Sequence, residues 1–220
     1  MAGRSFFFAA SALEDGVTAY WMGQWGNIKE RGSLSPGNGL WVDAPTALAT
    51  SEVDGKLFLI VGAAGSGTLT SVMVNQWGGL FTRDHMLDSL STRFDGVSAV
   101  ETVTVGDRAF VLAGGADDGI SLFELSGDGK LHHLTSLADQ LGTTLTNISA
   151  ITAAEIGGEL QVFVAGAEAG VTQFVLDLGN LGATISGNNA DNLLTGGAQD
   201  DLILGYDGND TLNGGGAMIV

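Results

Sequence analysis

The chain has 220 residues, with 25 acidic and 8 basic side chains, a formal net charge of −17 and no cysteine. This acidity argues against binding to nucleic acid or to an anionic membrane surface, because both partners recruit positive charge. The lack of cysteine excludes disulfides and cysteine-ligated zinc. No apolar run reaches the roughly 18 residues that a membrane-spanning helix needs, so we expect no membrane span.

The chain begins with Arg4 and the apolar run FFFAASAL, residues 6 to 13. A charged residue before a short apolar run is typical of a secretory signal peptide. Here the run continues directly into Glu14 and Asp15, and it also fits the register of an internal repeat. We therefore expect a strand at this position rather than a cleaved signal.

Four eleven-residue segments share one pattern: FFFAASALEDG, LFLIVGAAGSG, AFVLAGGADDG and LQVFVAGAEAG. Their closing glycines, Gly16, Gly67, Gly119 and Gly170, lie 51, 52 and 51 residues apart. Each segment precedes an alternating stretch, such as VTAYWM or TLTSVMV. A β-branched and aromatic run that ends in small residues and then alternates predicts strand, turn and strand.

Four dipeptides suit the tight turns between antiparallel strands: Asp54-Gly55, Gly106-Asp107, Asp128-Gly129 and Gly157-Gly158. Only two prolines occur, and helical periodicity is nearly absent. The single helical element that we expect is one short turn within Leu134 to Leu141. The body of the chain is therefore predicted to be all-β.

A period of about 51 residues with four strands is typical of a β-propeller blade. We predict β-propeller-like blades over residues 1–182, with about three and a half units. The first lacks its opening strand and the fourth lacks a clear closing strand. The pattern is similar to that of lactonase-like and YVTN-type propellers, in which strands ending in small residues line the centre. Three arrangements stay open: a four-bladed ring, a homodimer that completes a larger ring, or a fragment of a longer protein.

Catalytic motifs are missing from the sequence. The only histidines are His85, His132 and His133, and neither H-E-x-x-H nor G-x-S-x-G is present. We expect solvated strand positions for the His132-His133 pair. For the acidic pairs Glu14-Asp15 and Asp117-Asp118 we expect roles in chain bends rather than in cation binding. The sequence therefore favours a protein without enzymatic activity.

Four tryptophans lie in the predicted blades: Trp21, Trp25, Trp41 and Trp77. Large aromatic side chains of this kind usually fill a propeller core, and we expect that role here. The alternative is a lectin-like site in which the indole rings stack on sugars.

The last segment, Gly187 to Gly216, contains three consecutive nine-residue units: GNNADNLLT, GGAQDDLIL and GYDGNDTLN. A glycine opens each unit, and the sixth position holds Asn192, Asp201 and Asp210 in turn. The eighth position is always a leucine or isoleucine. Glycine permits the left-handed turn, a carboxylate supplies the hard oxygen that calcium prefers, and the aliphatic side chain suits a narrow core.

These units resemble the RTX (hemolysin-type) calcium-binding repeat. The resemblance implies a short C-terminal parallel β-roll over residues 183–220, with two units to each turn and one or two Ca²⁺ ions. It also implies a bacterial protein that is secreted to the extracellular space by type I secretion. The ligands expected from the resemblance and from the oxygen-bearing residues near position six are Asp191, Asn192, Asp200, Asp201, Asp207, Asn209 and Asp210.

Together these features predict a secreted calcium-binding protein whose β-propeller is a non-enzymatic interaction or structural module. Calcium ions are the expected partners, and an extracellular glycan or protein is the candidate partner of the propeller. Two alternatives stay open: a lactonase-like hydrolase with a metal at the propeller centre, and a lectin or adhesin. The predicted central strands, rich in Ala, Gly, Val and Phe, argue against the hydrolase.

Overall fold

The computed structural model of the chain describes residues 5–157, 159–177 and 181–215. These residues form strands and one short 3-10 turn, η1 (Pro36–Asn38), so the all-β prediction is confirmed. The chain divides into two compact units, Met1–Ala154 with Gln161–Phe174 and Glu155–Leu160 with Val175–Val220. The boundary expected between residues 182 and 183 stays a prediction. No helix among the described residues has the length and apolar character that crossing a bilayer requires.

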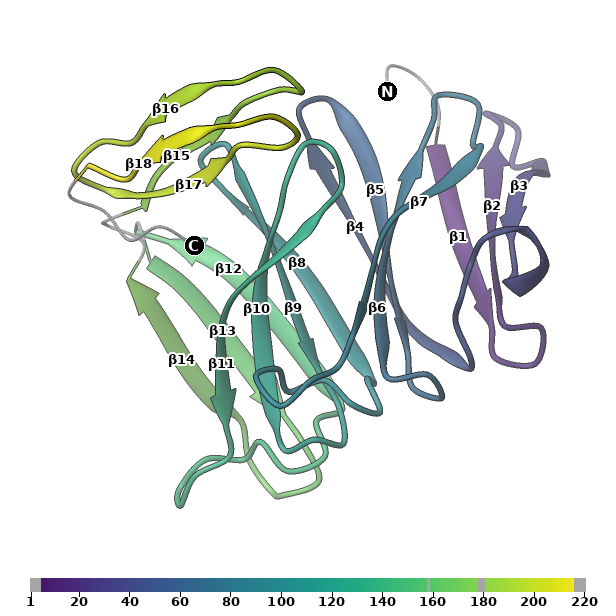
Figure 1. Cartoon of the computed structure of the whole chain (residues 1–220). Helices are drawn as coiled ribbons and strands as arrows, with labels where there is room; N and C mark the ends of the chain where they lie inside the picture. The colour runs from purple at the N-terminus through teal and green to yellow at the C-terminus, as the bar shows by residue number, and fades with distance from the viewer. Residues whose placement is uncertain (1–4, 158, 178–180, 216–220) are drawn as a thin grey trace. The chain divides into compact units, whose positions relative to one another are not determined.

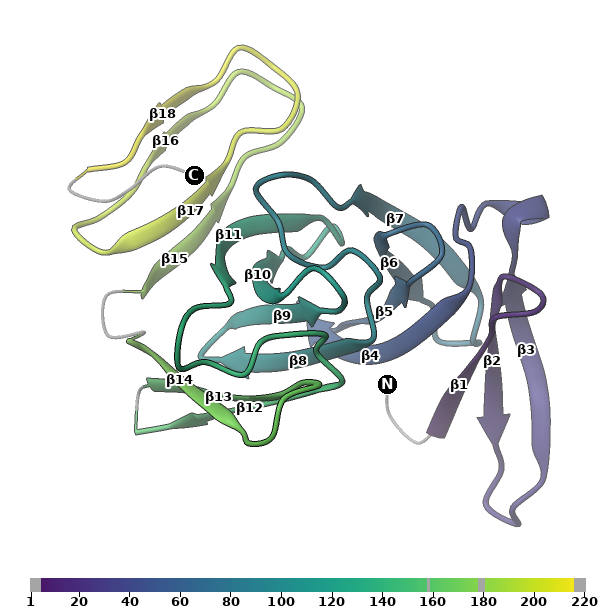
Figure 2. The ribbon, with the colours of Figure 1, turned by 90° about the horizontal axis from the view of Figure 1, so that it is seen from below.

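Four sheets follow one another along the first 177 residues (Figures 1 and 2), and we number them as blades 1 to 4. Their strand orders are β1-β2-β3, β4-β5-β6-β7, β8-β9-β10-β11 and β12-β13-β14. The bounds are β1 (Ser5–Ser11), β2 (Gly16–Met22), β3 (Ile28–Leu34), β4 (Pro45–Val53), β5 (Lys56–Ala63), β6 (Thr68–Val74), β7 (Leu80–Leu87), β8 (Ala99–Val105), β9 (Arg108–Gly114), β10 (Gly119–Leu125), β11 (Leu131–Ala138), β12 (Ala150–Ile156), β13 (Glu159–Ala165) and β14 (Thr172–Asp177). Within the described residues, blade 1 has no strand equivalent to β4, and blade 4 has none equivalent to β11.

The predicted hairpin turns join neighbouring strands. Asp54 and Gly55 both have positive φ, 52° and 68°, between β4 and β5, and Gly106 has φ 59° between β8 and β9. Gly158 and Arg4 lie outside the described residues. The predicted helical turn after Leu134 is wrong, because β11 continues to Ala138 and pairs with β10 along its length. Pairing with a neighbouring strand overrides the local pattern there.

The first strands of blades 2 and 3, β4 and β8, lie side by side (Figures 1 and 2). The prediction that repeated segments such as AFVLAGG line the centre is therefore wrong. Those segments form the second strands, and all of β9 is buried. A strand that is covered on both faces reads as a continuous apolar run, which explains the composition that suggested a central position.

Buried apolar clusters join consecutive blades. The cluster between blades 1 and 2 contains Val17, Ala19, Leu34, Leu40, Val42, Leu59, Val61, Ala63, Val72, Val74 and Leu80. The cluster between blades 2 and 3 contains Val53, Phe58, Ile60, Leu69, Phe94, Val97, Val100, Ala109, Val111, Ala113, Phe123, Leu125 and Leu131. Full burial of a valine, leucine, isoleucine or phenylalanine side chain stabilises a fold by about 1.5–3 kcal/mol. A blade therefore depends on its neighbours for its core.

Hydroxyl groups near the first strands also join the blades. The Thr46 hydroxyl donates a hydrogen bond to the Val97 carbonyl, and the Ser98 hydroxyl donates one to the Ile148 carbonyl. These pairs occupy equivalent places in successive blades. The interaction between blades is therefore repeated in the same way as the sequence.

The fourth strand of each complete blade, and β3 of blade 1, carries a bulge at an equivalent place. The extra residues, inferred from the register shifts, are Arg31, Arg83 and Leu134. A Cβ atom on Gly78 of blade 2 would collide with Arg31, and one on Gly129 of blade 3 would lie 2.7 Å from the Arg83 Cβ. The hairpin before each fourth strand thus packs on the bulge of the preceding blade, and only glycine leaves enough room there.

The second unit contains four short strands: β15 (Leu181–Ser186), β16 (Leu193–Thr195), β17 (Asp200–Leu204) and β18 (Thr211–Asn213). β15 pairs with β17 and β16 with β18, both in parallel. Leu194 faces Leu212, which is 18 residues further along the chain (212 − 194). Two nine-residue units therefore make one turn, and the predicted parallel β-roll is confirmed.

Candidate metal centre in the C-terminal roll

The glycine that opens each nine-residue unit lies directly against the side chain at position six. A Cβ atom on Gly205 would lie 2.5 Å from Asp210 Oδ2, and one on Gly196 would lie 2.6 Å from Asp201 Oδ2. On Gly187 a Cβ would collide with Asn192 Oδ1. Glycine is needed here because a polar oxygen occupies the space that any other side chain would fill.

One edge of the roll, which we call edge A, stacks residues 187–192 on residues 205–210. Asp191 Oδ1 accepts a hydrogen bond from the Asn209 amide at 2.8 Å, and Asp210 Oδ1 accepts one from the Asn192 amide at 2.8 Å. The Thr211 amide donates to the Asn192 carbonyl at 2.8 Å. Four of the predicted ligands, Asp191, Asn192, Asn209 and Asp210, are therefore brought together.

The opposite edge, edge B, holds Asp201 and is built differently. Asp201 Oδ1 accepts from the Ala183 amide at 2.7 Å, and its Oδ2 accepts from the Gly197 amide at 2.6 Å. The residue one turn earlier at position six is Ala183 (201 − 18), which supplies no side-chain oxygen. Asp201 is buried and acts as a structural acceptor for two backbone amides.

The remaining predicted ligands lie apart from these contacts. Asp200 begins β17 and pairs with Leu181 across the ladder. Asp207 is exposed in the turn of edge A, between Tyr206, with φ 64°, and Gly208, with φ 123°. The structure thus places the predicted ligands at two edges, and within residues 181–215 only edge A stacks two position-six residues that carry oxygen.

The oxygens of edge A suit a hard cation. Calcium binds carboxylate oxygens, side-chain amide oxygens and backbone carbonyl oxygens. Edge A offers the carboxylates of Asp191 and Asp210, the side-chain oxygen of Asn192, and the backbone carbonyl of Gly205 near Gly187. No group of three or more His, Cys, Asp or Glu side chains within the described residues could hold a metal ion. A cation at edge A would therefore depend on amide and backbone oxygens as well as on carboxylates.

The three histidines lie in strands of blades 2 and 3, and each contacts a hydroxyl group. His85 Nδ1 lies 2.8 Å from Thr70 Oγ1, His132 Nε2 lies 3.2 Å from Ser126 Oγ, and His133 Nε2 lies 2.8 Å from Ser136 Oγ. The expected solvated positions of His132 and His133 are wrong, since both are half-buried. Burial lowers the pKa of His132 below its ordinary value of 6.5, against the nearby carboxylates, of which Asp128 has the largest effect.

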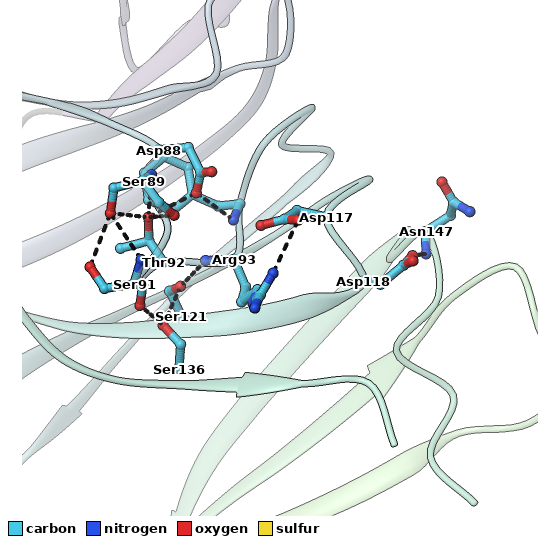
Figure 3. A network of polar contacts seen from close by, with 11 residues as sticks. Asp88, Ser89, Ser91, Thr92, Arg93, Asp117, Asp118, Ser121, Ser136 and Asn147 are labelled. Carbon is cyan, nitrogen blue, oxygen red and sulfur yellow. Dashed lines mark hydrogen bonds and ion pairs between the residues drawn. The ribbon is translucent and has the colours of Figure 1, made fainter. Parts of the chain in front are cut away.

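Ser136, the partner of His133, belongs to a polar network between blades 2 and 3 (Figure 3). Ser136 Oγ donates to the Ser91 carbonyl at 3.0 Å and lies 2.9 Å from Ser121 Oγ. The Ser121 hydroxyl in turn accepts from the Arg93 amide at 2.7 Å. The Ser136 hydroxyl thus contacts three groups: the Ser91 carbonyl, the Ser121 hydroxyl and the His133 ring.

The acidic pairs lie at the bends, and one carboxylate of each pair binds a backbone amide that precedes the following blade. Asp15 Oδ1 accepts from the Ala44 amide at 2.9 Å, and Asp118 Oδ1 accepts from the Asn147 amide at 3.0 Å (Figure 3). Asp117 forms an ion pair of 3.4 Å with Arg93. These carboxylates hold the connection between blades.

Aspartates in the connections between blades have a second structural use. Asp139 accepts hydrogen bonds from the Thr143 hydroxyl at 2.7 Å and from the Leu145 amide at 3.0 Å. These two bonds hold the pKa of Asp139 below its ordinary value of 3.8, with the hydroxyl contributing most. Asp88 makes the same two contacts with Thr92 and Phe94.

The prediction that the tryptophans fill the core is wrong for three of the four. Trp25, Trp41 and Trp77 are 86%, 68% and 60% exposed. Trp25 and Trp77 lie in equivalent hairpins, each preceded by glutamine and followed by glycine. Trp21 is partly buried, with the Arg31 guanidinium 5.0 Å from the centre of its ring. The exposed side chains leave a binding role open.

No family model matches the sequence, and no curated protein is similar enough to be a relative. Solved structures with weak similarity include a protein of unknown function from Desulfotomaculum acetoxidans, with 15% identity, a TM-score of 0.48, and coverage of 77% of this chain and 56% of that one. The Aleuria aurantia lectin in complex with Fucα1-6GlcNAc is 14% identical, with a TM-score of 0.42 and coverage of 74% and 53%. An α-L-arabinofuranosidase from Clostridium thermocellum is 10% identical, with a TM-score of 0.48 and coverage of 80% and 66%. The chain thus spans 53% to 66% of the length of these three proteins, and none of their ligands or activities is transferred to it.

Proposed function

We propose that the C-terminal roll binds Ca²⁺ at edge A and that this binding completes the folding of the roll in a secreted protein. The supporting observation is the stacking of Asp191 and Asn192 on Asn209 and Asp210, one turn of the roll apart. The unit-opening glycines bring the chain within contact of the position-six oxygens. This arrangement concentrates oxygen ligands that are far apart in an extended chain.

Electrostatics gives calcium a reason to act as a switch. Five aspartates lie in the three units, and no Lys or Arg follows Lys130 in the chain. Without a cation, repulsion between these carboxylates opposes the stacking of the turns. A bound divalent cation removes the repulsion, so its binding free energy becomes folding free energy. Calcium is scarce inside cells and abundant outside, which would keep the roll open during export and close it afterwards.

Circular dichroism and melting of the full chain in chelator, followed by a calcium titration, test this proposal. At a calcium concentration 100 times the dissociation constant, binding should stabilise the roll by about 2.7 kcal/mol. Asp210→Asn is the most informative variant, because an amide oxygen can still accept the hydrogen bond from the Asn192 amide. The result of Asp201→Asn would be harder to interpret, because both side-chain oxygens of Asp201 accept structural hydrogen bonds.

The matched control is Asp107→Asn, which makes the same charge change in an exposed hairpin of blade 3. We expect calcium to stabilise the original protein and the control equally, and to stabilise Asp210→Asn much less. An unchanged melting curve at millimolar calcium would show that the roll does not bind calcium. Equal responses of Asp210→Asn and the original protein would show that edge A is not the site.

We further propose that the propeller-like unit is a non-enzymatic interaction module. The observation that favours a glycan as its partner is the exposure of Trp25, Trp41 and Trp77. Indole faces stack well on the apolar faces of sugars, and a site of this kind needs exposed aromatic rings. Quenching of tryptophan fluorescence by a panel of glycans tests this second function. A response that Trp25→Ala and Trp77→Ala both retain would contradict a role for these two hairpins.

A further inference from the structure

The aspartates of edge A come from two stacked turns of the roll. Asp191 belongs to the first turn and Asp210 to the next, and each accepts a hydrogen bond from a backbone amide of the other turn. Carboxylates stacked in this way repel each other, and the repulsion grows where water is partly excluded. The closing of edge A is therefore opposed until a cation lies between the turns.

The aspartates of edge B come from a single turn. Asp200 and Asp201 are neighbours in the chain, and the described residues stacked on either side of them, 181–183 and 214–215, are not acidic. Among the described residues, edge B therefore has no carboxylate that faces another across two turns. The repulsion between turns that opposes the closing of edge A does not act there.

Asp201 joins two turns of the roll through one side chain. Its Oδ1 accepts a hydrogen bond from the Ala183 amide, one turn earlier, at 2.7 Å, and its Oδ2 accepts one from the Gly197 amide of its own turn at 2.6 Å. Hydrogen bonds from amides to a carboxylate are shorter and stronger than those between neutral groups. One carboxylate thus fixes the spacing of the two turns without a cation.

The Asp201 carboxylate is also enclosed. Asp201 is 6% exposed, whereas Asp191 of edge A is an exposed residue. A Cβ atom on Gly182 would collide with Asp201 Oδ1, and one on Gly196 would lie 2.6 Å from Asp201 Oδ2. A cation at Asp201 would compete with the two amides that it already binds, and a buried amide that loses its acceptor is costly. At edge A a cation meets an exposed carboxylate.

We propose that Asp201 holds two turns of the roll in register without calcium, and that this register places Asp191 and Asp210 for the cation at edge A. We call the two hydrogen bonds of Asp201 the Asp201 link. Next to the link, β15 and β17 pair in parallel through Ile185 and Ile203 (Figure 1). The role of Asp201 as a positioning residue rests on the proposed calcium site at edge A, but the link itself needs no ion.

Amide hydrogen exchange of the full chain, resolved by residue with NMR, tests the link. An amide that donates a hydrogen bond in a stably folded segment exchanges slowly. We expect the Ala183 and Gly197 amides to be protected equally in chelator and in millimolar calcium. The Asn192 and Asn209 amides of edge A should exchange faster in chelator, and should gain up to about 100-fold protection at a calcium concentration 100 times the dissociation constant.

The two edges report on the two proposals separately. Free exchange of the Ala183 and Gly197 amides in chelator would overturn the Asp201 link, whatever calcium does at edge A. If these two amides are protected in chelator and calcium changes nothing at Asn192 and Asn209, the link is supported and the calcium site is contradicted.

A charge placed opposite Asp201 tests the physical reason for the link. Residue 183 is exposed and lies one turn before Asp201, so Ala183→Asp stacks a second carboxylate on it, as at edge A. In chelator at neutral pH, the Gly197 amide of this variant should lose about tenfold or more of its protection. Ala183→Asn, which has the same size and no charge, is the matched control and should keep it. Equal exchange of Gly197 in the two variants would contradict the electrostatic basis of the link.

Removing the link should weaken calcium binding at the other edge. The side-chain amide of Asp201→Asn has only one acceptor oxygen, so in chelator the Ala183 or the Gly197 amide should lose protection. Calcium must then order both edges, and the midpoint of the edge A response should move to about tenfold higher calcium or more, with the same circular dichroism at saturation. Asp200→Asn, the same charge change one residue away, should leave the midpoint unchanged. Equal midpoints for the two variants would show that Asp201 does not position edge A.

Discussion

The packing of each hairpin on the preceding blade predicts a specific cost for adding one methyl group at Gly129. This glycine has φ 92°, and a Cβ atom would lie 2.7 Å from both Arg83 Cβ and Phe58 Cε1. Phe58 is fully buried, so its ring cannot move into solvent. The Gly129 carbonyl also accepts a hydrogen bond from the buried Ser71 hydroxyl. Gly129→Ala should therefore disturb the contact between blades 2 and 3.

Gly106→Ala separates this effect from the cost of the backbone conformation. Gly106 also has positive φ, 59°, but a Cβ atom there would meet nothing within 4 Å. The left-handed conformation costs about 1–2 kcal/mol for an alanine, and both variants bear it. Overpacking adds about 1–3 kcal/mol, which only Gly129→Ala should show. The reduced freedom of the unfolded chain is the same for both variants and cancels.

Urea unfolding of the two variants, in chelator and followed by circular dichroism, measures the difference. We expect Gly129→Ala to lose about 1–3 kcal/mol more than Gly106→Ala. A unit of this size should also melt about 2–4 °C lower for each kcal/mol. Equal losses for the two variants would refute the idea that the hairpin is held closely against the preceding blade.

Two further predictions concern buried charges in blade 3. Glu124→Gln removes the charged partner of Arg108 from a buried ion pair and should lower the free energy of unfolding by about 3–5 kcal/mol. The double variant Arg108→Met with Glu124→Leu should recover most of this loss. Equal urea midpoints for Glu124→Gln and the double variant would contradict this prediction. The folded protein holds the pKa of His132 below 6.5. Between that lowered pKa and 6.5, the unfolded chain therefore binds more protons than the folded protein does. The free energy of unfolding should fall as the pH drops through this window. His132→Gln should flatten the pH dependence of the melting temperature, and an unchanged slope would show that His132 does not contribute.

Much of the fold is readable from the sequence because two repeats are visible in it. The 51-residue spacing of Gly16 and Gly67 predicts blades, and the nine-residue spacing of Gly187 and Gly196 predicts a parallel roll. Both follow from local rules for turns and side-chain alternation. The sixth positions of the units follow from the nine-residue register together with the resemblance to the calcium-binding repeat. Their division between edge A and edge B follows from the 18-residue turn of the roll.

The inner strand of each blade and the exposure of the tryptophans were predicted wrongly for one physical reason. Alternation shows that Phe7 and Leu59 both point to one face of a sheet, but it cannot show whether another sheet covers that face. The covering residues come from a blade about 50 residues away. The sequence by itself therefore determined the two repeats and the turns. Only the tertiary structure decided that Leu59 is a core residue and Phe7 a surface residue, because burial is set by contacts between distant segments.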